Sequence, residues 1–103
     1  MNWNEVYEWL KSHGHINDEW ENIAVTDDGF YAEDKMENTF ISLFTRGSDD
    51  ELVFYVGCLR PKVSVGSCTG LYVSHSGDVI GFLEDHLEYM YDALMRKVME
   101  NNG

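Results

Sequence analysis

Basic residues are scarce in this sequence. The 103 residues include 19 Asp and Glu but only 7 Lys and Arg, which gives a formal net charge of -12. A surface this negative repels nucleic acid and anionic membranes, and it attracts basic protein surfaces over a distance. Direct binding of nucleic acid or membrane is therefore not expected, and the charge favours a basic protein surface as the partner.

Proline, cysteine and long apolar runs are also rare. A single Pro and 9 Gly indicate neither a linker nor a low-complexity segment. No stretch approaches the roughly 18 apolar residues of a membrane span, and the first residues lack the basic and apolar parts of a signal peptide. The two cysteines, Cys58 and Cys68, are fewer than small secreted domains carry. We predict one cytoplasmic domain spanning residues 1–103, with reduced thiols unless neighbouring strands align the two cysteines.

Motifs of catalysis and of cofactor binding are missing. His13 and His15 lie close in sequence, but a metal site needs three or four convergent ligands. Cys58 and Cys68 lack the surroundings of a nucleophile paired with a histidine. Carboxylates are so numerous that no pair is distinguished as a general acid and base. We therefore predict no catalytic residue, no metal and no cofactor, and a small enzyme using a cysteine or histidine remains the third choice.

Two segments have helical periodicity. In residues 2–12 the apolar side chains recur at helical spacing, Asn2 and Glu5 fit a capping box, and Gly14 is suited to end the helix. Residues 78–101 form the stronger pattern, with a continuous apolar stripe at Leu83, Leu87, Met90, Leu94 and Val98. The start of this second helix stays open, because residues 79–83 could instead extend a strand.

Residues 20–75 have the pattern of a sheet. Asp27, Asp28 and Gly29 mark a turn, and the clearest hairpin joins 39–45 to 52–59. Its first strand carries apolar side chains on both faces, so each face is covered or one meets a partner. A further hairpin is expected from Val63, Val65, Leu71 and Val73, with its turn near 66–67 or 69–70.

The order of these patterns predicts an α+β domain. It has a short N-terminal helix, an antiparallel sheet of four or five strands, and a long C-terminal helix packed on the sheet.

Acidic residues gather in turns and along the C-terminal helix. Glu84, Glu88 and Asp92 recur every four residues, with Asp85 beside them, although like charges at this spacing destabilise a helix by roughly 0.2–0.5 kcal/mol per pair. This cost suggests that the stripe serves binding. The predicted partner-binding residues are Glu84, Asp85, Glu88, Asp92, Asp27, Asp28, Asp49, Asp50 and Glu51. Phe40 or Phe44, if exposed, would supply an apolar anchor.

In length, charge, its single proline and its acidic turns beside helices and sheet, the chain resembles small acidic inhibitors made by bacteriophages and mobile elements. These include anti-CRISPR proteins and DNA mimics. It is also similar to acidic immunity proteins that neutralise basic nuclease toxins. The resemblance implies a non-catalytic inhibitor of a nucleic-acid-binding surface, such as that of a CRISPR effector or another defence nuclease. The alternative is an assembly module that self-associates through the 39–59 hairpin as a homodimer.

Overall fold

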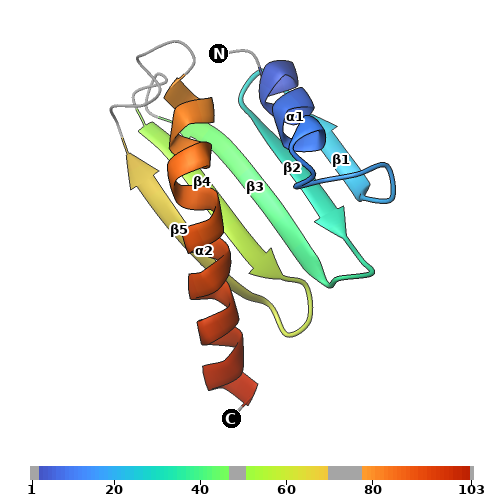
Figure 1. The fold of residues 1–103 in the computed structure, drawn as a ribbon, viewed down its shortest axis with the longest axis vertical. Coiled ribbons are helices and arrows are strands. Elements are labelled where there is room, and N and C mark those ends of the chain that lie inside the picture. Colours follow the sequence, from blue (N-terminus) through green and yellow to red (C-terminus); the bar gives the residue numbers. More distant parts are fainter. Residues whose placement is uncertain (1–2, 47–50, 70–77, 103) are drawn as a thin grey trace.

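A computed structural model describes residues 3–46, 51–69 and 78–102, and it has the predicted α+β architecture (Figure 1). A short helix comes first, five strands follow, and a long helix comes last. The elements are α1 (Trp3–Ser12), β1 (Glu21–Val25), β2 (Gly29–Asp34), β3 (Thr39–Arg46), β4 (Glu51–Cys58), β5 (Val63–Thr69) and α2 (Asp78–Asn102).

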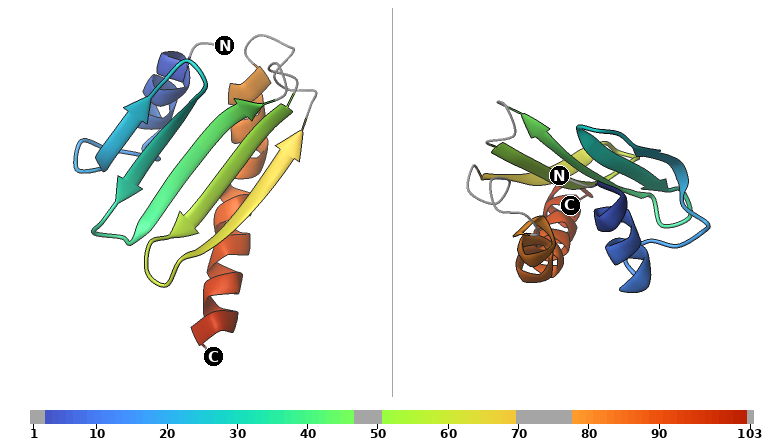
Figure 2. Two further views of the ribbon diagram at one scale, coloured as in Figure 1. Left: turned by 180° about the vertical axis from the view of Figure 1, so that it is seen from behind. Right: turned by 90° about the horizontal axis from the view of Figure 1, so that it is seen from above.

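The five strands form one antiparallel sheet in the order β1-β2-β3-β4-β5, so each strand pairs with its neighbours in sequence. Both helices lie on the same face of this sheet, α1 near β1 and β2, and α2 across β4 and β5 (Figure 2). The predicted hairpin is confirmed: β3 and β4 are paired along their full length, with Leu43 opposite Phe54 and Ile41 opposite Val56.

The core lies between the sheet and the two helices. The helix-facing side chains of β3 and β4, including Ile41, Leu43 and Phe54, are fully buried. From α2, Leu83, Leu87 and Leu94 of the predicted stripe pack against them. Because burying a leucine contributes on the order of 1.5–3 kcal/mol, this stripe determines which face of α2 turns towards the sheet.

Helix α1 ends as its sequence predicts. Gly14 has a φ of +77°, which a glycine adopts without steric cost. The amide of His15 donates to the carbonyl of Leu10 at 2.9 Å, and that of Gly14 donates to Lys11 at 3.1 Å. This pair of bonds satisfies carbonyls that the helix end would otherwise leave exposed. Asn2, the other half of the predicted capping box with Glu5, lies outside the described residues.

The start of α2 is settled by the structure: residues 79–83 are helical and do not extend a strand. Val79 and Phe82 are buried. The ring of Phe82 meets Phe54 of β4 edge to face, with centroids 6.0 Å apart.

Of the two turn positions left open for the second hairpin, 66–67 and 69–70, the first is wrong. Strand β5 continues through Gly66 instead of turning at 66–67. Gly66 lies opposite Tyr55 in the register, and a Cβ added there would lie 2.3 Å from the Tyr55 ring. The glycine therefore makes room for a cross-strand ring. Gly70, Leu71 and Val73 of the predicted hairpin lie outside the described residues.

The sheet face opposite the helices is covered by its own aromatic side chains. Phe40 lies opposite Gly57 just as Tyr55 lies opposite Gly66, and a Cβ on Gly57 would meet the Phe40 ring at 2.3 Å. Neighbouring Val53 is only 1% exposed and Phe40 only 8% exposed, although none of the described helices lies on this face. Rings that lie flat over glycines thus account for the apolar side chains on both faces of the hairpin.

The register also separates the two cysteines. Cys58 pairs with Val63 and Cys68 with Val53, so their positions differ by five residues along β4. That separation is about 17 Å, far beyond the reach of a disulfide. The structure therefore excludes the disulfide between them, and Cys58 is a buried free thiol.

We expect the ring of Tyr55 and the missing side chain of Gly66 to be energetically coupled. Gly66→Ala alone should destabilise the protein by about 1–3 kcal/mol, because the new methyl group overlaps the ring. Tyr55→Ala alone should cost about 1–2 kcal/mol of apolar burial. The double variant should lose at least about 1 kcal/mol less than the sum, as measured by urea unfolding.

Gly81→Ala is the matched control for this cycle. Gly81 lies in α2 and has no atom within 4 Å of an added Cβ. Alanine should therefore stabilise this position by up to about 1 kcal/mol. Strict additivity of the Tyr55 and Gly66 substitutions would show that the ring does not depend on the glycine.

Candidate acidic interface on helix α2

The predicted acidic stripe occupies the outer face of α2. Glu84, Asp85, Glu88 and Asp92 are all exposed, whereas the opposite face of the helix carries the buried leucines. Residues Glu84, Glu88 and Asp92 fall on one line that extends on the order of 12 Å along the helix axis. The packed stripe on the inner face holds this line pointing away from the sheet.

These carboxylates are not neutralised within the described part of the chain. The ion pairs there join Lys11 to Asp18, Lys35 to Glu21, and Arg46 to Glu51. None of them engages the four α2 acids. Their mutual repulsion therefore persists in the folded state, and a cationic partner surface would relieve it.

Two exposed methionines continue the same line. Met95 is 55% exposed and Met99 is 69% exposed, and they follow Asp92 at helical spacing in the C-terminal part of α2. Methionine side chains are flexible and adapt to irregular apolar surfaces. The outer face of α2 is thus acidic in its first half and apolar in its second. The sequence analysis missed these methionines, although their spacing from Asp92 was a readable signal.

The predicted partner-binding acids outside α2 differ in their positions and in their hydrogen bonds. Asp27 and Asp28 are exposed between β1 and β2, and the amide of Thr45 donates to the Asp28 carbonyl at 2.9 Å. This turn lies at the end of the sheet where α2 begins (Figure 1). Glu51 lies in β4, not in a turn, and its two oxygens accept bonds of 2.8 and 2.9 Å from Arg46. Asp49 and Asp50 lie outside the described residues.

The expected aromatic anchors are not available on the surface. Phe40 is buried and Phe44 is half-buried, because both belong to the self-covered face of the sheet. Tyr89 on α2 is instead strongly exposed, at 70%.

The two neighbouring histidines pack around a tryptophan. The rings of His13 and His15 stack on Trp9, with centroids 4.4 and 5.5 Å away. His13 Nδ1 lies 2.9 Å from the Trp9 carbonyl oxygen. Burial lowers the pKa of His15, His13 lowers it further, and Glu88 raises it. Across residues 3–46, 51–69 and 78–102, no three His, Cys, Asp or Glu side chains converge on a metal position.

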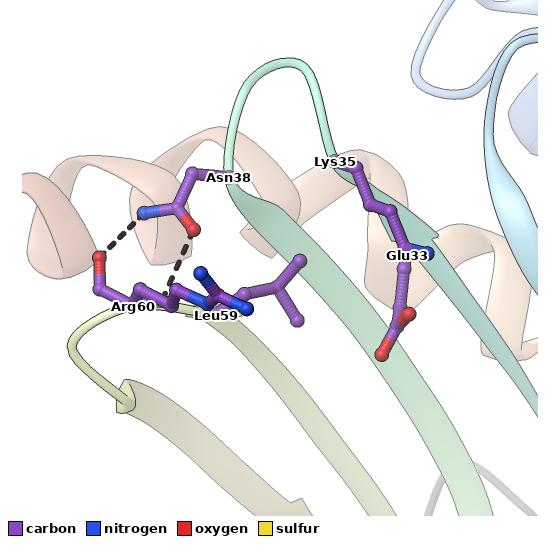
Figure 3. Close-up of a pocket in the computed structure, with 5 residues that line it drawn as sticks. All are labelled: Glu33, Lys35, Asn38, Leu59 and Arg60. Atoms are coloured by element: carbon purple, nitrogen blue, oxygen red, sulfur yellow. Dashed lines mark hydrogen bonds between the residues drawn. The ribbon is translucent and has the colours of Figure 1, made fainter.

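A cavity of about 520 Å³ lies where the β2–β3 and β4–β5 connections meet (Figure 3). Asn38 joins the two connections by donating to the Arg60 carbonyl at 2.6 Å and accepting from the Arg60 amide at 3.0 Å. Glu33 accepts from the Tyr31 hydroxyl at 2.6 Å, and this bond lowers the pKa of Glu33. The lining residues are Glu33, Lys35, Asn38, Leu59 and Arg60. Among the described residues that line it there is no serine, cysteine or histidine.

No known protein family, curated protein or solved structure matches this chain. Among the described helices, none has the length and apolarity that crossing a membrane requires. The function must therefore be argued from the surfaces themselves.

We expect His15 to titrate below its ordinary pKa of 6.5 in the folded protein, as followed by NMR of the imidazole protons. Because its pKa is lower when folded, His15 contributes stability above pH 6.5 that is lost as pH falls through the folded pKa. The urea midpoint should fall over that window, and His15→Gln should remove this part of the fall.

Two neighbours provide opposite controls for this titration. His13→Gln should raise the pKa of His15 and Glu88→Gln should lower it, since these neighbours act on it with opposite sign. A His15 that titrates at or above 6.5 would contradict the partial burial of its ring as the cause of the lowered pKa.

Proposed function

We propose that this protein is a non-catalytic inhibitor that binds a basic surface of a partner protein through the outer face of α2. The observation that supports this most directly is the line of Glu84, Glu88 and Asp92 with Asp85 beside it, exposed and without a cationic partner among the described residues. Acids selected for helix stability alone would alternate with lysines at this spacing.

A nucleic-acid-binding surface is the basic surface best suited to this face. Duplex DNA carries one charge per roughly 1.7 Å of axis, whereas carboxylates four residues apart repeat about every 6 Å. The line is therefore too sparse to copy a duplex alone, and Asp27 and Asp28 at the same end of the sheet add to it. Steering does not need a matched spacing, because an acidic face accelerates association with a basic groove.

The methionines supply the short-range part of the contact. Surface electrostatics are screened within about 10 Å at ordinary salt concentrations, whereas burying one methionine contributes on the order of 1.5–3 kcal/mol. Met95 and Met99 lie on the same helix face as the acids. The partner surface is accordingly a basic groove with an apolar patch beside it.

The kind of partner follows from the resemblance to anti-CRISPR and DNA-mimic inhibitors, which makes a defence nuclease such as a CRISPR effector the first candidate. A basic nuclease toxin is the alternative, with this chain as its immunity protein. Both partners would present a basic groove that normally holds nucleic acid.

The sheet topology restricts the alternative function, which is self-association through the 39–59 hairpin. Strands β3 and β4 of the 39–59 hairpin are central, and each already pairs on both sides. Self-association of that hairpin could therefore use only its helix-free face, on which Phe40 and Val53 are already buried.

We expect the triple variant Glu84→Gln, Asp85→Asn, Glu88→Gln to lose its partner without losing its fold. In a pull-down from bacterial lysate at low salt, the wild type should recover a basic nucleic-acid-binding protein, which high salt releases and added duplex DNA displaces. The triple variant should recover at least about tenfold less. It should unfold at the same or a higher urea concentration, because like-charge pairs are removed.

A matched variant tests whether net charge alone is responsible. Glu5→Gln, Glu8→Gln, Glu19→Gln removes three exposed carboxylates on and after α1. It should still recover the partner. Equal loss in both variants, or retention in both, would reject α2 as the binding face.

A further inference from the structure

A second surface lies on the other flank of α2, where the helix meets the edge of the sheet. A groove of about 300 Å³ separates them, lined by Val65, Tyr89, Asp92, Ala93, Arg96, Lys97 and Glu100. Strand β5 ends the strand order, so one side of its backbone has no strand beside it among the described residues. Such an edge is a template for another strand.

The backbone of β5 is also within reach of a donor outside the sheet. The Lys97 amine on α2 donates to the carbonyl oxygen of Ser64 at 3.0 Å. In the single chain this carbonyl of the edge strand is therefore bonded to a side chain of α2, and a second β5 strand that pairs here would replace the Lys97 amine as its partner.

The charges along this groove are balanced, unlike those of the whole protein. Asp92 and Glu100 face outward with Arg96 and Lys97, two acids and two bases, in a chain of net charge -12. Two copies of this protein repel each other over most surfaces. This flank of α2 is a place where they can meet without that repulsion.

We infer that β5 and this flank of α2 form an interface between two copies of the chain, related by a twofold axis. The β5 strands pair antiparallel and join the two sheets, and the two α2 helices lie side by side above them. A twofold interface must be complementary to itself. Asp92 and Arg96 lie equally far on either side of Leu94, so an axis near Leu94 sets Asp92 of each copy against Arg96 of its partner copy.

The packing of α2 supports this arrangement. The helix lies over β4 and β5 rather than over the middle of the sheet (Figure 2), so the axis at the β5 edge brings the two helices close together. Tyr89, exposed at 70%, lies in the same groove and would be covered by the partner copy. Glu84, Asp85 and Glu88 lie beyond this contact, and a dimer would present them twice. The interface itself does not depend on the proposed inhibitory function.

The test exchanges the sign of one charge at a time. Wild-type protein should sediment as a dimer in analytical ultracentrifugation. Asp92→Lys alone and Arg96→Glu alone should each weaken self-association by at least about tenfold, because like charges would then face each other across the axis. An equimolar mixture of the two variants should dimerise again, because both charge pairs across the axis are then opposite in sign.

Two further variants control for net charge. Glu8→Lys matches the charge change of Asp92→Lys, and Lys35→Glu in the β2–β3 connection matches that of Arg96→Glu, at exposed positions away from the groove. Both should dimerise as the wild type does, and circular dichroism should show every variant folded. A monomeric wild type would overturn the inference, including the case in which the edge instead accepts a peptide from another protein. So would a dimer that both single variants preserve, or a mixture that stays monomeric.

Discussion

The packing of the α2 leucine stripe on the sheet, over β4 and β5, is the interaction on which the other features depend. Leu83, Leu87 and Leu94 belong to the same buried cluster as Phe54 of β4, and this packing fixes the rotation of α2 about its own axis. Every other position on the helix follows from that rotation. Glu84 and Glu88 are exposed outside the groove, whereas Asp92, Arg96 and Glu100 line the groove beside the β5 edge.

Both helices lie on one face, so within residues 3–46, 51–69 and 78–102 the opposite face of the sheet has no second layer. On this face, aromatic rings cover glycines of the neighbouring strand. Phe40 lies over Gly57, and Tyr55 lies over Gly66. Because a glycine has no side chain to pack, it weakens a strand, and a cross-strand ring restores apolar contact at that point. Val53, two residues before Tyr55 on the same face of β4, is also buried, although none of the described helices covers it.

Hydrophobic periodicity predicted most of this fold, because the apolar positions of an amphipathic helix or of a strong hairpin indicate which face is buried. The end of α1 near Gly14 could be predicted from the sequence, because helix C-termini are closed by hydrogen bonds between backbone groups that are close in sequence. The extent of β5 could not be predicted from the sequence. Gly66 indicates a turn unless it is known that the ring of Tyr55 on β4 lies opposite it. The α2 acids were found by their four-residue repeat. The pairing of Glu51 with Arg46 depends on cross-strand register, which the sequence does not state. The burial of Phe40, which removes it as an exposed apolar anchor, likewise depends on its cross-strand register with Gly57.

Charge distribution distinguishes the two flanks of α2 in a way that composition cannot. A uniform excess of acids would confer solubility and nothing more. Here the outer face of α2 carries neighbouring acids, among which Glu84 and Glu88 repel each other, whereas Arg96 and Lys97 balance the acids of the groove beside β5. Repulsion retained on a helix lowers stability, so it persists only where the leucine stripe offsets it. The outer face of α2, where acidic side chains repel each other, is therefore suited to a basic partner protein. The flank beside β5, where acids and bases are equal in number, is suited to a second copy of the chain.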